Sequence, residues 1–391
     1  MKRLVDILKK IALTSSRPIK RLFGDQFFED LRPEFLWLET TDACGNQCTF
    51  CDIWENKATR HPLTPAEIET VLGDPLFQGL RVVVVSGGEP TLRKDLAEIL
   101  SAVHRAAPRA YVVLSSSAML PDRLLSAVRS ALDEGMDLEV GISVDGLAAR
   151  HDQARGVAGL FDKVDRTLRE LAELKRLHAR LRVKIGFVLS DATVDQMDAV
   201  SDYAAALGFE FNVQWYNQAA YYGNVGRDLL SDTAQLERAT RSLRPTPLRT
   251  WGRRVLRGKP LDYNCSTLHN SCLLKCNGDV VPCFNYWDQT AGNVRQETPS
   301  SLWKSERARQ ARRVVRACHG CLNSCGVQWS FEANYIARAR FYLRHPGLLL
   351  EKLGWSRARG GARARRPGER EAGPATQPQL IPLERLRTHH R

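Results

Sequence analysis

The sequence predicts an α/β fold built on a parallel sheet, and three observations support this prediction. Strand-like segments alternate with helix-like segments from residue 35 to residue 215, which is the pattern of βαβ units. Residues 81–86 (RVVVVS) form a run of β-branched apolar residues, as in a strand covered on both faces. The series holds six strands over roughly 190 residues, too few for a complete eight-stranded barrel.

The expected elements can be placed in chain order. The strands cover residues 35–39, 81–86, 110–115, 138–144, 182–189 and 210–215. The helices cover residues 95–106, 121–134, 160–179 and 194–207. Because parallel α/β folds place their chemistry at the C-terminal ends of the strands, the residues directly after each strand are the first candidates for a site.

Three closely spaced cysteines follow the first expected strand. Cys44, Cys48 and Cys51 form a C-x3-C-x2-C series. Three thiolates can bind three irons of a 4Fe-4S cluster and leave the fourth iron open to a small-molecule chelator. A zinc knob, a simple electron-transfer cluster and structural thiols are the alternatives for this spacing.

A glycine-rich turn ends the second expected strand. It consists of Gly87, Gly88, Glu89 and Pro90. Adjacent glycines let the backbone approach a ligand closely, and the proline fixes the direction in which the chain leaves. The alternative is an ordinary turn between a strand and a helix.

Together, the cysteine series and the glycine turn resemble those of the radical S-adenosylmethionine (radical SAM) enzymes. The resemblance implies that the amino acid end of S-adenosylmethionine binds the open iron. One-electron reduction then releases a 5'-deoxyadenosyl radical, which abstracts a hydrogen atom from the substrate. Phe50 would pack near the adenine, and the turn at residues 87–90 would meet the ammonium group. The implied fold is a partial (β/α)6 TIM-like barrel.

A third motif follows the fourth expected strand. The series SVDG…HD…RG, over residues 143–156, also resembles the family. It implies that Ser143 and Arg155 hold the carboxylate or ribose of S-adenosylmethionine, whereas loop hydrogen bonds and helix capping are the alternative. The chain departs from the family after the third strand, where Ser116-Ser117-Ala118 replaces the usual Thr-Asn-Gly. The sequence names no catalytic acid or base. In this chemistry the nucleoside radical abstracts the hydrogen atom, so a general base is not required.

The remaining seven cysteines all lie after residue 264. They are Cys265, Cys272, Cys276, Cys283, Cys318, Cys321 and Cys325. Their clustering favours metal ligands, and the lack of a signal peptide argues against a disulfide framework. Cys265, Gly278 and Cys283 fit a C-x12-G-x4-C pattern, and the last three cysteines form C-x2-C-x3-C.

These patterns partly resemble the SPASM and twitch extensions of radical SAM enzymes, which carry one or two auxiliary 4Fe-4S clusters. The resemblance implies one auxiliary cluster on Cys265, Cys283, Cys318 and Cys321. Cys325 either replaces one of these ligands or joins Cys272 and Cys276 on a second cluster. The family's five-residue spacing and its further cysteine are missing here, and a zinc ribbon is the alternative.

Positive charge is concentrated at the two ends of the chain. The formal net charge is +13, with +6 in residues 1–23 and +9 in residues 335–391, which leaves the region between them near −2. This distribution argues against nucleic acid as the substrate.

A helix over MKRLVDILKKIALTSS would place Leu4, Leu8 and Ile11 on one face. Such a helix docks on its own protein or lies on an anionic membrane surface, but its charges rule out a spanning helix.

The sequence therefore divides into six expected parts. They are a basic amphipathic segment (1–34), a radical SAM partial barrel (35–230), a linker (231–260), a SPASM/twitch-like iron-sulfur module (261–330), a helical extension (331–355) and a disordered basic tail (356–391). The expected location is cytoplasmic, including the membrane surface if the first segment binds lipid.

These features predict a radical SAM enzyme that modifies an unidentified substrate with the help of an auxiliary cluster. Peptide maturation is slightly favoured, and oxidation of a sugar, another small molecule or a lipid-linked substrate is the alternative. A non-catalytic electron-transfer protein has no need for the GGEP and SVDG motifs. The expected electron donor is a flavodoxin or a ferredoxin. The residues after the sixth strand either line the substrate side of the barrel or pack against the appended module; they are Tyr216, Asn217, Tyr221 and Tyr222.

Overall fold

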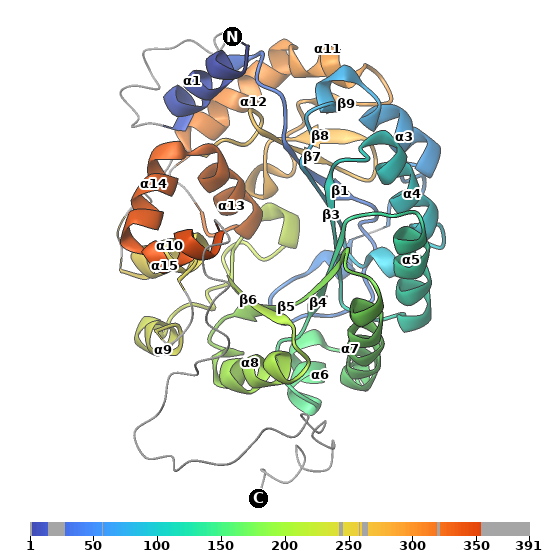
Figure 1. Cartoon of the computed structure of the whole chain (residues 1–391), viewed down its shortest axis with the longest axis vertical. Helices are drawn as coiled ribbons and strands as arrows, with labels where there is room; N and C mark the ends of the chain where they lie inside the picture. The colour runs from blue at the N-terminus through green and yellow to red at the C-terminus, as the bar shows by residue number, and fades with distance from the viewer. Residues whose placement is uncertain are drawn as a thin grey trace, which may run out of the picture. The chain divides into compact units, whose positions relative to one another are not determined.

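A single nine-stranded sheet runs through the chain (Figure 1). The computed structural model describes residues 2–14, 28–56, 58–241, 245–257, 259, 265–318 and 321–352. Six parallel strands follow the spatial order β6-β5-β4-β3-β2-β1. Their bounds are Phe35–Glu39 (β1), Val82–Ser86 (β2), Tyr111–Ser116 (β3), Leu138–Ser143 (β4), Leu181–Leu189 (β5) and Glu210–Trp215 (β6). The predicted fold class is confirmed, with each strand within one residue of its expected position.

Helices connect these strands and cover the sheet on the outside, where Figure 1 shows α3, α4, α5 and α7 in a row. The connecting helices are Pro65–Leu72 (α3), Leu96–Ala106 (α4), Pro121–Asp133 (α5), Ala149–Arg155 (α6), Leu160–Leu177 (α7) and Met197–Ala206 (α8). Each of the longer ones buries one apolar stripe; α4, for example, buries Leu96, Ile99, Leu100 and Val103. This is the amphipathic pattern expected of a helix packed on a sheet.

The inner face of the sheet is less apolar than the face beneath the helices. In β5, Val183, Ile185 and Phe187 are buried, while Lys184 and Gly186 alternate with them on the other face. Because successive side chains of a strand point to opposite faces, this alternation places a charged side chain and an open position inside the partial barrel. The inner face therefore leaves room for a site.

The cysteine-rich region extends the same sheet. Strand β7 (Ser271–Leu274) pairs in parallel with β1, with Phe35 opposite Ser271. Strands β8 (Asp279–Val281) and β9 (Gly292–Asn293) continue the sheet in antiparallel fashion. The short helices η6 (Ala220–Tyr222) and η7 (Phe284–Tyr286) also contact each other. The first strand of the barrel is thus hydrogen-bonded on both edges, with the cysteine-rich region on one of them.

The rest of the C-terminal region is helical. It contains Pro299–Trp303 (α11), Glu306–Ala317 (α12), Ser324–Ala333 (α13), Tyr335–Arg344 (α14) and Pro346–Lys352 (α15). Residues 231–260, expected as a linker, hold the helices Thr233–Ala239 (α9) and Pro247–Leu256 (α10). The described residues up to Ala339 form one compact unit, and the described residues from Arg340 onward belong to a second. The predicted disordered tail (356–391) lies outside the described residues, and the predicted domain boundaries stay predictions.

The N-terminal helix α1 (Lys2–Thr14) docks on the protein through a face that the sequence did not indicate. Ala12 and Leu13 pack with Phe28 and Leu31, whereas Leu8 is more than half exposed. Lys9 is nearly buried, and its Nζ lies 3.1 Å from Asp30 Oδ2. None of the helices in the described ranges combines the length and apolar character needed to cross a membrane.

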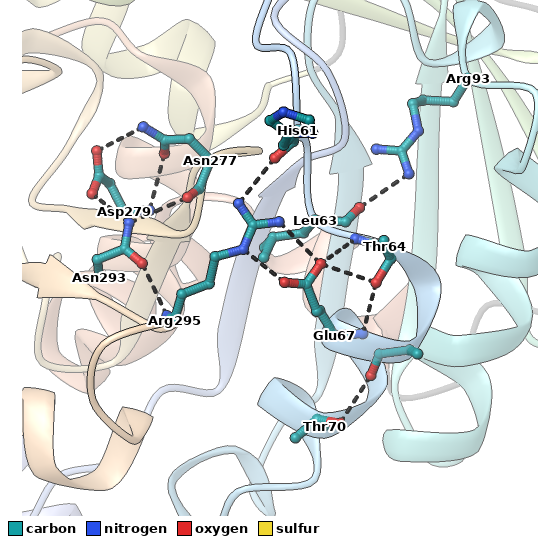
Figure 2. Close-up of polar contacts among 11 residues, drawn as sticks. His61, Leu63, Thr64, Glu67, Thr70, Arg93, Asn277, Asp279, Asn293 and Arg295 are labelled. Atoms are coloured by element: carbon teal, nitrogen blue, oxygen red, sulfur yellow. Dashed lines mark hydrogen bonds and ion pairs between the residues drawn. The ribbon is translucent and has the colours of Figure 1, made fainter.

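A polar network ties the loop after β9 to α3 (Figure 2). The Arg295 guanidinium forms a two-pronged ion pair with Glu67, with distances of 2.7 and 3.0 Å, and donates a third hydrogen bond to the carbonyl oxygen of His61 (2.9 Å). These hydrogen bonds from Arg295 are the main reason why the pKa of Glu67 falls to about 2. Leu63 N–H also donates to the carbonyl oxygen of Cys276 (2.6 Å). The network fixes the segment that follows the first cysteine series against the cysteine-rich region.

We expect Arg295→Ala to lower the free energy of unfolding by about 1 kcal/mol or less, because both side chains are about one third exposed and solvent screens the pair. The folded-state pKa of Glu67 lies below its unfolded value, so the stabilisation is complete above about pH 4.5 and is lost as pH falls toward 2. Urea titrations should therefore give the same difference from the wild type at about pH 8 and about pH 5.5. A difference that titrates between these two values would contradict the assignment to Glu67.

Candidate active site

The first cysteine series lines one end of a cavity of about 250 Å³ at the C-terminal ends of the strands. Cys44, Cys48 and Cys51 all contribute to the lining. They lie in an irregular loop between β1 and the short helix Ile53–Glu55 (η2). Burial raises the pKa of the Cys44 thiol to about 11 and that of Cys51 to about 12. Binding iron as thiolates would therefore release protons and would compensate charge that is costly to bury alone.

The glycine turn lies directly against the loop that carries these cysteines. Gly88 N–H donates to Thr41 O (2.7 Å), and Glu89 N–H donates to Ala43 O (2.9 Å). Gly87 has a φ of +142°, and a Cβ there would lie 2.3 Å from Thr41 O; at Gly88 it would lie 2.1 Å from Ala43 O. Glycine is required at both positions because backbone, rather than side chain, packs here. Pro90 then starts the short helix Pro90–Leu92 (η4).

Glu89 is almost fully buried, and its two carboxylate oxygens accept five hydrogen bonds. Thr91 donates from its N–H and hydroxyl, Ser116 donates from its hydroxyl, and Ser117 donates from both N–H and hydroxyl, at 2.6 to 3.0 Å. The Ser116-Ser117 pair that departs from the family pattern therefore has a clear role, because it holds the glutamate of the glycine turn. This arrangement fixes a carboxylate beside the cavity that forms no ion pair with any of the described residues.

Arg155 lies at the cysteine end of the same cavity and is 8% exposed. Its Nη2 is 2.5 Å from Asp145 Oδ2, and its Nη1 is 3.7 Å from Cys48 Sγ. The guanidinium also lies over the ring of Phe50, 5.2 Å from the centroid. Its Nε has no hydrogen-bond partner among the described residues. Ser143 and Phe50 line the cavity as well, so the predicted cofactor-binding residues surround the three cysteines, except Pro90, which does not line the cavity.

We expect Arg155→Met to destabilise the protein by about 3–5 kcal/mol, because it leaves the buried Asp145 carboxylate without its cation. The double variant Arg155→Met, Asp145→Asn should recover most of this loss, since no buried charge is then left unpaired. Urea unfolding of the wild type and three variants forms a double-mutant cycle. Additive effects of the two substitutions would contradict a direct ion pair.

Four cysteines of the C-terminal region surround a second, smaller cavity of about 30 Å³. They are Cys265, Cys283, Cys318 and Cys321, the four that the sequence assigned to an auxiliary cluster. The other lining residues include Leu273, Phe284, Val315 and Trp329. Four thiols in an apolar environment suit a fully ligated 4Fe-4S cluster. In the described part of the chain, no three or more His, Cys, Asp or Glu side chains lie close enough together to hold a single metal ion. The four cysteines instead line a cavity.

The other three late cysteines do not come together. Cys272 lies on β7, where it is 1% exposed and opposite Leu36 of β1. Cys276 follows β7, and its N–H donates to Glu39 Oε2 (3.0 Å). Cys325 instead lines the first cavity, with the three cysteines of the first series. Within the described residues, the structure thus groups the ten cysteines as four around each cavity and two outside both.

A cluster of aromatic side chains separates the two cavities. Tyr221 and Tyr222 pack against Phe284 and Trp287, and Phe284 lines both cavities. The Tyr221 hydroxyl donates to the carbonyl oxygen of Gly87 (2.8 Å). The residues after β6 were expected either to line the substrate side of the barrel or to pack against the appended module, and they do both. All four line the first cavity, namely Tyr216, Asn217, Tyr221 and Tyr222. Tyr221 and Tyr222 also contact the cysteine-rich region.

Sequence reasoning missed several residues of this site. Asp145 was only part of a motif, yet it holds Arg155. Lys184 lines the first cavity, and its ammonium pairs with Glu139. The signal for Lys184 was available, since it alternates with the apolar residues Val183, Ile185 and Phe187 and therefore faces the opposite side of the strand. Asn46, between the first two cysteines, gave no such signal.

Comparison with known proteins agrees with this geometry. Residues 38–197 match the Radical SAM superfamily, and residues 265–323 match SPASM, an iron-sulfur cluster-binding domain. Mycofactocin maturase MftC of Mycolicibacterium smegmatis is 27% identical over 80% of this chain and 81% of its own length. Fe-coproporphyrin III synthase of Methanosarcina barkeri is 31% identical, but over only 49% of this chain and 46% of its own length.

Solved structures share the fold. Streptococcus suis SuiB bound to S-adenosylmethionine has a TM-score of 0.57 and 17% identity, with 74% of this chain and 72% of SuiB covered. The enzyme anSMEcpe with bound S-adenosylmethionine has a TM-score of 0.55 and 17% identity, with 82% and 97% covered. The chain thus belongs to the radical SAM superfamily. It is a radical SAM enzyme with a C-terminal SPASM domain, and its cofactors are a 4Fe-4S cluster and S-adenosylmethionine.

Proposed function

We propose that this protein modifies a peptide by radical chemistry in the cavity beside Cys44, Cys48 and Cys51. The observation that carries the proposal is the convergence of these cysteines with Glu89 and Arg155 on one cavity at the strand ends. When bound there, the cluster and S-adenosylmethionine supply a 5'-deoxyadenosyl radical. The three thiols would hold the cluster, the Glu89 turn would meet the ammonium group, and Ser143 and Arg155 would meet the carboxylate or ribose.

The second cavity supports one auxiliary cluster that transfers electrons. Four cysteines would complete its ligand set, so no iron would be left to bind the substrate. The cavity is small and its lining is almost entirely apolar, which suits a redox centre better than a binding site for a polar molecule. The aromatic cluster of Tyr221, Tyr222, Phe284 and Trp287 would lie between this centre and the substrate. A flavodoxin or ferredoxin is the proposed donor of the electrons.

A peptide substrate is supported by the relatives that extend over most of the chain. The match to mycofactocin maturase includes both the barrel and the cysteine-rich region, and SuiB has also been solved bound to the precursor peptide SuiA. The match to a probable GTP 3',8-cyclase, by contrast, spans only 44% of this chain. This supports peptide maturation over small-molecule chemistry. The proposed location is the cytoplasm, with α1 as the element that would meet a membrane surface.

Anaerobic assay of the reconstituted protein tests this function. The protein is supplied with dithionite, S-adenosylmethionine and a synthetic peptide encoded beside its gene, and 5'-deoxyadenosine and the peptide are measured by mass spectrometry. We expect 5'-deoxyadenosine together with a change in the mass or stereochemistry of the peptide. Formation of 5'-deoxyadenosine with every neighbouring peptide unchanged would reject the peptide substrate. No 5'-deoxyadenosine from protein with its full iron content would reject the radical chemistry itself.

A further inference from the structure

Cys325 is the one late cysteine that lines the first cavity. Helix α13 begins at Ser324, and the Asn323 side chain caps it by accepting a hydrogen bond from Gly326 N–H (3.1 Å). Cys321 precedes this helix and lines the second cavity, whereas Cys325 lies in its first turn. The chain therefore passes from the second cavity at Cys321 to the first cavity at Cys325, where the helix begins. Because four other cysteines line the second cavity, the auxiliary cluster does not need Cys325 as a ligand.

An independent observation indicates that the cavity is built around a ligand. Asn46 lines it and is only 3% exposed. Its Nδ2 donates to Ser117 Oγ (2.7 Å), which fixes the amide, but its Oδ1 has no hydrogen-bond partner among the described residues. An unpaired buried acceptor destabilises the folded protein, because it has lost its hydrogen bonds to water without replacement. A bound molecule with an N–H or O–H group would remove this cost.

The surroundings of Cys325 suit a thiol that stays protonated. Burial raises the pKa of Cys325 to about 11, and the Lys184 ammonium opposes this shift only in part. Lys184 can lie inside the barrel because residue 141 is glycine, where a Cβ would be 3.3 Å from Lys184 Cε. Tyr222 is close enough to Cys325, Cys51 and Cys321 for each thiol to raise its pKa, although burial is the larger cause. Cys325 thus shares the first cavity with a proton donor, Lys184, and with Tyr222 of the aromatic cluster next to the second cavity.

We propose that Cys325 returns a hydrogen atom to the substrate radical, which makes the reaction redox-neutral for the substrate, as in inversion of a stereocentre. This inference rests on the proposed function. The nucleoside radical takes hydrogen from a substrate C–H bond and becomes 5'-deoxyadenosine. The resulting carbon radical then takes the hydrogen atom of the Cys325 S–H bond, which is weaker than a C–H bond. A new C–H bond forms, the S–H bond breaks, and a thiyl radical is left on Cys325.

The thiyl radical needs one electron and one proton to restore the thiol. The electron comes from the reduced 4Fe-4S cluster at the second cavity, recharged by a flavodoxin, a ferredoxin or dithionite. The proton comes from the Lys184 ammonium, which solvent reprotonates. Each cycle therefore consumes one S-adenosylmethionine and two electrons, the first for cleavage of the sulfonium and the second for the thiyl radical, and it leaves the oxidation state of the substrate unchanged.

Deuterium transfer tests this role without knowledge of the substrate. In D2O the thiol exchanges to S–D, and without substrate the nucleoside radical abstracts hydrogen from the weakest bond within reach. We expect most 5'-deoxyadenosine from the wild type, reduced with dithionite, to carry one deuterium. Cys325→Ser keeps the size and polarity of the side chain, but its O–H bond is too strong to react. This variant should lower the deuterated fraction at least about tenfold.

Cys272→Ala is the matched control, because Cys272 lies outside both cavities, and it should keep the label. A second measurement does not depend on turnover. In the reconstituted protein with both clusters loaded, prolonged treatment with iodoacetamide at about pH 9 should alkylate Cys325, because a pKa of about 11 leaves a small fraction of thiolate at that pH, and S-adenosylmethionine should protect it. Unlabelled 5'-deoxyadenosine from the wild type, a label that survives in Cys325→Ser, or no alkylation of Cys325 at full iron content would each overturn the inference. Absence of 5'-deoxyadenosine from iron-loaded wild type would reject the proposed function instead.

Discussion

Replacement of Cys48 by alanine is expected to reduce 5'-deoxyadenosine formation to the level of a protein-free control. Cys48 is the most buried of the three cysteines at the first cavity, and its sulfur lies 3.7 Å from Arg155 Nη1. With two thiols left, a second iron loses its protein ligand, and the cluster is no longer held in one orientation. Iron content should fall from about eight to about four atoms per chain, because the second site keeps its own four.

Cys272→Ala serves as the comparison for this experiment. It removes the same sulfur atom from a fully buried side chain but touches neither cavity, so iron content and 5'-deoxyadenosine should stay close to those of the wild type. The assignment of the first cysteine series would be wrong if Cys48→Ala kept both. Equal losses in the two variants would point to misfolding and not to a lost ligand.

Replacement of Cys321 by alanine should separate the two cofactor sites. The variant loses one of four ligands at the second cavity, so about four irons should remain per chain, at the first site. Cleavage of S-adenosylmethionine with dithionite should continue, since the first cavity keeps its three cysteines. Turnover of the true substrate should stop, because no reduced cluster is available beside the aromatic residues.

The same variant should also be less stable. Ligation at the second cavity joins cysteines that are more than fifty residues apart in the chain, and a bound metal cluster adds its binding free energy to folding. Denaturant unfolding followed by circular dichroism, under anaerobic conditions, should give a midpoint well below that of the wild type. An unchanged midpoint combined with full iron content would show that the four cysteines are not cluster ligands.

The parallel strands and the grouping of the second cysteine set could be predicted from the sequence. The period-two alternation of β5 and the continuous β-branched run of β2 reflect burial, which the side chains themselves encode. The spacing of Cys265, Cys283, Cys318 and Cys321 matched a known pattern in part, and these four cysteines do line one cavity. Local patterns of this kind depend on few residues and therefore remain visible in one sequence.

Contacts between distant segments could not be predicted in this way. The four residues of β7 do not indicate that they pair with β1, because a short apolar strand fits many edges. The position of Cys325 depends on where α13 begins, and hence on the direction of the first helical turn, which the C-x2-C-x3-C spacing does not contain. The hydrogen bonds from Ser116 and Ser117 to Glu89 likewise join three separate segments, so a departure from the family motif could be noticed but not explained.

The pairing of β1 with β7 also affects the order in which the chain folds during synthesis. Strand β1 leaves the ribosome more than two hundred residues before its second neighbour, and contacts of such long sequence separation form slowly. Until β7 emerges, one edge of β1 exposes unpaired backbone groups next to the loop of Cys44, Cys48 and Cys51. The nascent barrel is thus an incomplete folding unit, and the loop of the first cysteine series follows a strand that gains its second neighbour only after the whole barrel has been made.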